Sequence, residues 1–319
     1  MAIFWTMHQV HHSSEFFNYS VPFRLPHLHD FVHFGLFYAP LALLGVPVRV
    51  AFIHKQLNLI YQFWTHSDLV PKLPWPIELI FNTPSHHRVH HARQARYLDK
   101  NYGAVFIVWD RLFGTFCEED DADAPSYGIT VPQRSLNVLT YQVAGSIELF
   151  EKFKSMDGWR NKVQCLIKGP GWEPGSPWTG FIDKVPVPDP QDKPVFKELS
   201  TFWEAFLFAD LIMMYLVFIM FLCRFDQIPH SSFYLLIIVL YYQAHCAAKT
   251  LEGDVAAAGL QALKFVGLSF LVPFGRSIFS KVSALEYMML NIAELLGFSM
   301  FLSLGLFIVM NYNAKRKLQ

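Results

Sequence analysis

The sequence predicts an all-α, polytopic membrane protein in which a histidine-rich helical region lies outside the membrane spans. The chain has 319 residues, of which 53% are hydrophobic and only 16% are charged, well below the usual charged share of about 25%. Its last third contains apolar runs of spanning or near-spanning length. Two copies of the pattern H-x-x-H-H lie upstream of those runs.

The composition also excludes some classes of protein. The formal net charge is zero, so bulk electrostatics indicate no nucleic-acid partner. The four cysteines show no close pairing, which favours buried, reduced thiols over a disulfide framework or a cysteine metal site. The N-terminus lacks the basic-then-apolar layout of a signal peptide.

The two histidine boxes are the most informative motifs in the chain. On a helix, positions i, i+3 and i+4 fall on one face, so each box can aim three imidazoles at one point. Clustered imidazoles are costly to bury without partners, and neutral imidazole is a common metal ligand. We therefore expect the boxes to enclose two metal ions, although ligand type alone does not choose the metal. The predicted ligands in the boxes are His8, His11, His12, His87, His90 and His91.

Other residues near the boxes are weaker candidates. His66, which follows an aromatic patch about twenty residues before the second box, is expected to be a seventh ligand. Glu15 is a candidate catalytic residue as an acceptor for a ligand imidazole, or simply a polar residue at a helix end. His29 and His33 have a one-face spacing and are either ligands or residues of the membrane interface.

The middle of the chain divides these motifs from the spans. Arg88, Arg93, Arg96, Lys100 and Arg111 are expected to form a cytosolic basic surface. The acidic run 118–123 is expected to be a solvated loop. The region 127–194 is rich in Pro and Gly and is expected to be a connection without regular helix, either a lid beside the site or a surface linker.

Four apolar runs are predicted as membrane spans. They cover residues 205–223, 232–248, 255–274 and 288–310. Asp210, Lys264 and Glu294 interrupt them and are expected to be functional, paired or snorkelling. Basic residues at 315–317 then end on the same side as the second box, which predicts that both boxes face the cytosol. The predicted organisation is a histidine-box region at 1–125, a connecting loop at 126–200 and transmembrane helices at 201–319.

These motifs resemble the fatty acid hydroxylase and sterol desaturase superfamily, which carries such boxes beside membrane spans. The resemblance runs from about residue 4 to residue 177 and is closest to the branch that acts on ether lipids. The matching segments are YQFWTH (61–66), NTPSHHRVHH (82–91), DKNYG (99–103), WDRLFGTF (109–116) and KGPGWEPGSP (168–177).

The resemblance implies a di-iron site ligated by the seven histidines, tetrahydrobiopterin as electron donor and dioxygen as oxidant. The implied reaction hydroxylates the ether-bearing carbon of an alkylglycerol and releases a fatty aldehyde and a glycerol derivative. The implied location is the endoplasmic reticulum membrane. The implied alternatives are another lipid hydroxylase or sterol oxidase of the superfamily and, from a different class, a non-catalytic membrane metal-binding protein.

The sequence departs from the family at one point. The family places an H-x-x-x-H pair followed by Glu just upstream of the first box, whereas this sequence begins seven residues before that box. Three explanations are open: a shortened or incomplete sequence, replacement of the pair by His29 and His33, or a non-catalytic relative.

Overall fold

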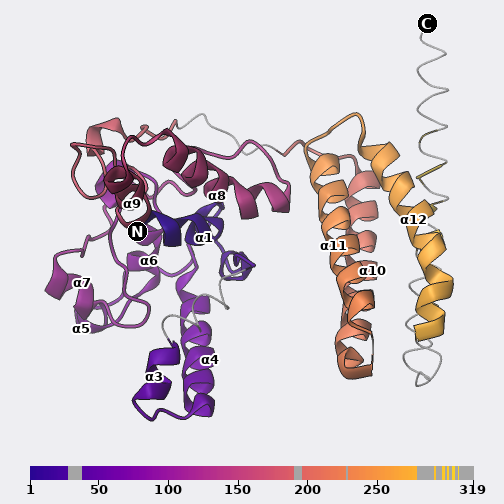
Figure 1. Cartoon of the computed structure of the whole chain (residues 1–319), viewed down its shortest axis with the longest axis horizontal. Helices are drawn as coiled ribbons and strands as arrows, with labels where there is room; N and C mark the ends of the chain where they lie inside the picture. Colours follow the sequence, from indigo (N-terminus) through magenta and orange to yellow (C-terminus); the bar gives the residue numbers. More distant parts are fainter. Residues whose placement is uncertain are drawn as a thin grey trace, which may run out of the picture. The chain divides into compact units, whose positions relative to one another are not determined.

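The computed structural model describes residues 1–27, 38–189, 196–227 and 229–278, with a few positions between 291 and 308. His29, His33 and Glu294 lie outside the described residues, as does most of the fourth expected span. The chain forms two compact units, one made of residues 1–134 and 141–194 and the other of residues 135–140 and 195–319. The described parts are helical, without strands beyond two isolated bridges (Figure 1), in agreement with the all-α prediction.

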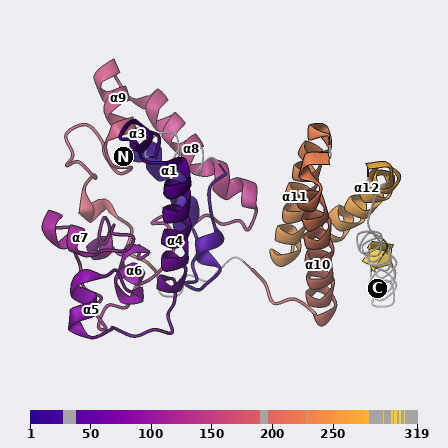
Figure 2. The same cartoon turned by 90° about the horizontal axis from the view of Figure 1, so that it is seen from below.

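The first unit carries both histidine boxes on short helices. Its α-helices are α1 (Ala2–His12), α3 (Ala39–Leu43), α4 (Val48–Thr65), α5 (Trp75–Ile80), α6 (Pro84–His90), α7 (Val108–Phe113), α8 (Val138–Ser155, begun in the other unit) and α9 (Trp159–Ile167). Helix α1 packs on α9, and α4 packs on α6 (Figure 2). The contact between α4 and α6 brings the end of α4 to the second box, and His11 of α1 meets His66 at the end of α4.

Local sequence signals explain why α6 begins and where it lies. Pro84 is the first residue of the helix, and Thr83 caps it in a capping box with His86, which satisfies free backbone N–H groups. The Asn101 side chain donates to the carbonyls of His86 (3.1 Å) and Cys117 (2.8 Å) and accepts from the Cys117 N–H (2.9 Å). Asn101 has a φ of +52°, which Asn tolerates better than most residues. The DKNYG loop thus anchors the second box.

The expectation that 127–194 forms no regular helix is wrong for two segments. Helices α8 and α9 occupy residues 138–155 and 159–167. Nearly all of the glycines and prolines lie before, between or after these segments, which contain no Pro and a single Gly, so the average composition hid two helix-forming runs.

The KGPGW segment that follows α9 is an ordered loop. The Gly169 N–H donates to the carbonyl of Trp178 (2.9 Å), and Trp172 is 2% exposed. A Cβ at Gly171 would lie 2.6 Å from the Thr179 carbonyl oxygen, so glycine is needed for this close approach of two backbones.

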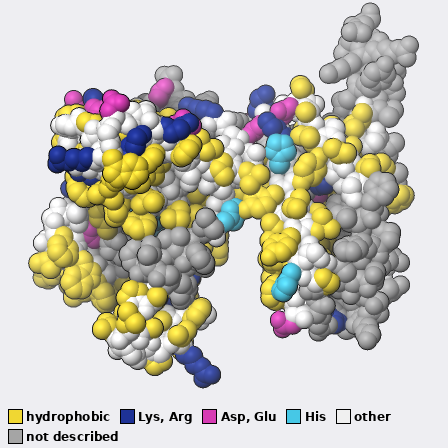
Figure 3. Space-filling view, in the orientation of Figure 1, with side chains coloured by type: hydrophobic (Ala, Val, Ile, Leu, Met, Phe, Trp, Pro, Cys, Tyr) yellow, Lys and Arg dark blue, Asp and Glu magenta, His cyan; other side chains and the backbone are white. Residues whose placement is uncertain are grey.

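Through residue 278, the described α-helices of the second unit are α10 (Thr201–Cys223), α11 (His230–Leu251) and α12 (Ala257–Ile278). These helices match three of the four expected spans. Helices α10 and α11 are long and apolar enough to cross a membrane. Their visible face carries many apolar side chains (Figure 3). Phe208, Leu211 and Ile238 on these helices are each more than 60% exposed. Such surfaces suit contact with lipid.

A buried polar cluster joins these helices. The Lys264 ammonium lies 2.5 Å from an Asp210 carboxylate oxygen and 2.6 Å from the Gln243 amide oxygen, and the Gln243 amide also donates to Asp210. Asp210 and Lys264 are almost fully buried. The expectation that the charges at 210 and 264 are paired is therefore confirmed.

Candidate metal centre

Three helices deliver seven histidines to one place. Helix α1 carries His8, His11 and His12 on one face, and α6 with its C-terminal residue carries His87, His90 and His91. His66 ends α4. The described residues group these side chains as two sets whose nitrogens lie within 4.8 Å of one another. The structure thus brings together every histidine that the sequence predicted as a ligand.

The first set, here called the four-histidine group, consists of His11, His66, His87 and His91. Its imidazoles meet through their Nε2 atoms. The Nε2 of His66 lies 3.1 Å from that of His11 and 2.9 Å from that of His87, and His87 lies 3.2 Å from His91. Ligands bound side by side at about 2.1 Å from one metal are about 3 Å apart, so these separations fit a metal site.

The second set, the three-histidine group, consists of His8, His12 and His90. The Nε2 atoms of His8 and His12 are 2.9 Å apart, and the rings of His12 and His90 are 4.8 Å apart. The ring of His12 also stacks on that of His91, at 4.2 Å between centroids. The two groups are therefore adjacent, and each mixes residues from both boxes.

Hydrogen bonds on the far side of two rings leave their converging nitrogens unprotonated. The Nδ1 of His66 lies 2.7 Å from the Gln62 carbonyl and that of His90 lies 3.1 Å from the Lys100 carbonyl, so in the neutral ring Nδ1 carries the proton. The Nε2 lone pair of His66 then faces two other imidazoles but can accept only one hydrogen bond. A bound cation resolves this arrangement, so the donor set fits a metal.

Burial keeps these imidazoles neutral. It lowers the pKa of His11, His12, His87 and His91 well below the ordinary value, and the neighbouring histidines lower it further. Burial also lowers the pKa of His66 to about 4, against the opposing effect of its hydrogen bond to Gln62. Neutral imidazole is the form that binds metal.

The two groups differ in what covers them. Phe17, 5% exposed, packs its ring 5.4 Å from that of His66 and 5.1 Å from that of His91, which covers the four-histidine group with an apolar side chain. All three members of the other group line a cavity of about 700 Å³. Further lining residues include Trp5, Tyr102, Leu149, Lys152 and Trp178. The three-histidine group is therefore the one that meets this cavity.

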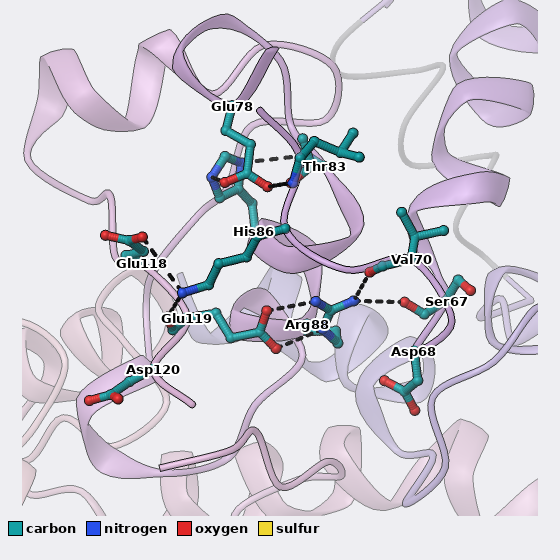
Figure 4. Close-up of polar contacts among 12 residues, drawn as sticks. Ser67, Asp68, Val70, Glu78, Thr83, His86, Arg88, Glu118, Glu119 and Asp120 are labelled. Atoms are coloured by element: carbon teal, nitrogen blue, oxygen red, sulfur yellow. Dashed lines mark hydrogen bonds and ion pairs between the residues drawn. The ribbon is translucent and has the colours of Figure 1, made fainter. Parts of the chain in front are cut away.

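Two polar residues near the boxes belong to neither group. Glu15 is partly exposed and lies beside Gly128, so its catalytic role stays a prediction. His86 precedes His87 but serves as the cap of α6: its Nδ1 accepts from the Thr83 N–H (3.4 Å), and its Nε2 is 3.7 Å from Glu78 (Figure 4).

The expected basic surface and solvated acidic loop are wrong at three positions. Arg88, Arg93 and Glu119 are all less than 10% exposed, and Arg88 pairs with Glu119 through two hydrogen bonds of 2.6 Å. The sequence held a signal for the burial of Arg88, because a charged residue between two box histidines sits on a largely buried helix. It held no comparable signal for Glu119, which lies 31 residues further along the chain.

One protein family and several known proteins are similar to this chain. The fatty acid hydroxylase family matches residues 1–115. The alkylglycerol monooxygenase of Danio rerio is 37% identical over 277 residues, which cover 86% of this chain and 60% of the relative. The human alkylglycerol monooxygenase is 42% identical over 184 residues, 58% of this chain and 40% of the relative. An ornithine lipid hydroxylase of Rhizobium tropici is 31% identical over 126 residues, 40% of this chain and 38% of the relative.

No solved structure matches the chain. The chain spans between 40 and 60% of the length of the two alkylglycerol monooxygenases compared above. The family match includes all seven histidines of the two groups. Residues 1–115 of this chain thus match the fatty acid hydroxylase family, and the chain is a homologue of the alkylglycerol monooxygenases.

Proposed function

We propose that this protein is a membrane mono-oxygenase that cleaves the ether bond of alkylglycerols. The observation that carries the proposal is the meeting of seven histidines in two adjacent groups, in a chain homologous to alkylglycerol monooxygenases. The products are a fatty aldehyde and a glycerol derivative. Tetrahydrobiopterin supplies two electrons, so that one oxygen atom of dioxygen enters the ether-bearing C–H bond and the other becomes water. The resulting hemiacetal then separates into aldehyde and alcohol.

Two iron ions are the proposed metals, one held by each histidine group. Iron supplies the activation of dioxygen, which no side chain of this site provides. Imidazole ligands suit iron, and seven neutral imidazoles leave the site less anionic than carboxylates would. The carbonyls of Gln62 and Lys100 orient His66 and His90 through their Nδ1 protons, which fixes the direction of the donor lone pairs.

The cavity beside the three-histidine group is the proposed substrate chamber. Its apolar and aromatic lining residues, such as Trp5, Leu149 and Trp178, suit an alkyl chain. Lys152 and Glu148 supply polar atoms for a head group. His8, His12 and His90 form part of the same wall, so a bound ether carbon can approach this group. Phe17 keeps water from the four-histidine group.

The proposed location is the endoplasmic reticulum membrane, with the histidine boxes toward the cytosol. Helices α10 and α11 support membrane insertion by length and composition. In the first unit, apolar side chains at the end of α3 (Leu43 and Leu44) and on α4 (Ile60) are between 69 and 89% exposed. Their exposure supports contact between this unit and lipid as well.

A second candidate is hydroxylation of another lipid. The relative from Rhizobium tropici, named for hydroxylation of an ornithine lipid, favours it. Dependence on tetrahydrobiopterin would separate the two candidates, because the sterol and fatty acyl members of the superfamily are expected to take electrons through cytochrome b5.

Iron content tests the proposal. We expect two irons per chain in the purified, detergent-solubilised protein and a loss of iron in His87→Ala, which lacks a member of the four-histidine group. The control is His54→Ala, because His54 is exposed on α4 and belongs to neither group. Two irons per chain retained in His87→Ala would contradict the site, whereas one iron retained by the three-histidine group would not.

Turnover tests the reaction. With iron bound, we expect fatty aldehyde from an alkylglycerol only when tetrahydrobiopterin and dioxygen are both present. Iron binding without turnover of any lipid would favour the non-catalytic metal-binding protein.

A further inference from the structure

Arg88 has a set of contacts that surface arginines do not make. It lies between His87 and His90 in sequence, yet its side chain is buried. Its Nε and one Nη donate to the two carboxylate oxygens of Glu119, each at 2.6 Å. Its other Nη donates to the carbonyls of Ser67 (2.9 Å) and Val70 (2.8 Å) (Figure 4). Four hydrogen bonds thus hold the planar guanidinium.

The two carbonyls belong to the turn that follows α4. Ser67 is the residue after His66, the member of the four-histidine group that α4 supplies. The arginine itself belongs to α6, which with its C-terminal residue supplies His87 and His91. Arg88 therefore ties together two chain segments whose imidazoles must meet at one point.

Glu119 holds the guanidinium from the other side. The Arg88–Glu119 pair, which holds the turn after α4 through Arg88, is here called the clamp. The Glu119 carbonyl also accepts a hydrogen bond from Lys72, at 2.6 Å, and Lys72 lies in the stretch after the same turn. The forked geometry of a guanidinium matches a carboxylate, whereas a Lys ammonium cannot make the same two parallel bonds.

We propose that Arg88 and Glu119 are positioning residues that set His66 in register with α6 and so complete the four-histidine group. This inference rests on the proposed function, since it assumes that the group holds a metal. Metal sites tolerate only small displacements of a ligand, about 0.2 Å. The three-histidine group draws its members from α1 and α6 alone. Loss of the clamp should therefore weaken one metal position and spare the other.

Cobalt binding to the metal-free 319-residue chain in detergent tests the proposal. We expect the wild-type chain to bind two Co²⁺ ions, seen by their visible absorption. In Arg88→Lys we expect one of the two to bind at least tenfold more weakly and the other to bind as in the wild type. His66→Ala should give the same selective loss. The matched control is Arg96→Lys, since Arg96 makes an exposed ion pair with Asp120 (2.9 Å) in the same unit.

A second variant guards against simple misfolding. Removing one member of a buried ion pair leaves an uncompensated charge, whereas replacing both by apolar residues is often tolerated. Arg88→Met combined with Glu119→Leu should therefore keep the fold, as judged by circular dichroism, and still show the selective loss of one Co²⁺.

The outcomes separate this inference from the proposed function. Two Co²⁺ bound with wild-type affinity by both clamp variants would overturn the inference and leave the proposed function standing. Equal weakening of both positions would also overturn it, because it would indicate a general structural role. If the His87→Ala variant binds Co²⁺ as the wild type does, the proposed function is overturned, and this inference with it.

Discussion

At the scale of single residues, neighbouring side chains of one type take different roles because helix geometry separates them. His86 and His87 are adjacent in sequence and both are buried. His86 points its Nδ1 at the N–H of Thr83 and caps α6, whereas His87 joins the four-histidine group. Successive residues on a helix are about 100° apart, so two adjacent imidazoles cannot serve one metal from this helix face.

The Arg88–Glu119 pair makes stability sensitive to acid. Burial would raise the pKa of Glu119, but the hydrogen bonds and charge of Arg88 hold it below the ordinary value. The unfolded chain, with a Glu pKa of about 4.3, therefore binds a proton before the folded chain does. The contribution of this pair is present above about pH 4.3 and is lost as the pH falls through the lower, folded-state pKa.

The variant Glu119→Gln tests this pH dependence. At neutral pH it should cost about 1–3 kcal/mol, because Arg88 loses a charged partner in a buried place. The difference in unfolding free energy from the wild type should shrink as the pH falls below about 4. The measurement is denaturant unfolding in detergent between pH 7 and 3.5. The control is Glu118→Gln at the exposed neighbouring position, and a pH-independent difference would contradict the prediction.

At the scale of elements, the second unit shows how three apolar helices are held in register. The apolar core between these helices includes Phe206, Met213 and Phe265. In lipid, however, no hydrophobic driving force holds one helix against another. The cluster of Asp210, Gln243 and Lys264 takes one residue from each of α10, α11 and α12. Its hydrogen bonds form only when each helix has one particular axial position relative to the other two.

Breaking this cluster on one side should be costly. We expect Lys264→Met to destabilise the protein by about 3–5 kcal/mol, because it leaves the Asp210 carboxylate buried without its cation. The double variant Lys264→Met with Asp210→Asn should recover part of that loss. The measurement is resistance to unfolding in a detergent titration. Lys249→Met is the control, since Lys249 forms a more exposed ion pair at the end of α11; equal losses in all three variants would count against the prediction.

At the scale of the whole molecule, the chain separates two tasks between its two units. The first unit contains both histidine groups and the cavity. Among the described residues, the second unit contains two helices, α10 and α11, that are long and apolar enough to cross a membrane. The exposed apolar residues of α3 and α4 support the proposal that the first unit also meets the bilayer. Under the proposed function, a lipid substrate held in the membrane would then reach the cavity without crossing bulk water.

The proposed orientation is open to a direct test with a single-cysteine variant. Cys117 lies in the first unit, is free and is partly exposed. In sealed microsomes with the cytosolic side out, we expect a membrane-impermeant maleimide to label Cys117 without detergent. A variant that retains only the buried Cys165 should stay unlabelled until it is denatured. Labelling of Cys117 only after permeabilisation would place the histidine boxes in the lumen.

What the sequence by itself determined follows from local periodicity. The spacing i, i+3, i+4 puts three imidazoles on one helix face whatever the surroundings, so the six histidines of the two boxes were identifiable from it, although their role as metal ligands stays a proposal. His66 lies outside this spacing and was predicted from its place near the boxes. The apolar runs likewise predicted α10, α11 and α12. Composition misled where it averaged over unlike segments, as in the stretch that contains α8 and α9.

Only the tertiary structure decided which histidines act together. Each group combines residues from both boxes, because the packing of α1, α4 and α6, not the spacing within a box, sets which nitrogens meet. The same holds for Arg88 and Glu119, which look like surface charges in the sequence and are buried together in the fold. Contacts between residues far apart in the chain form only when the core closes around them, and no local pattern specifies them.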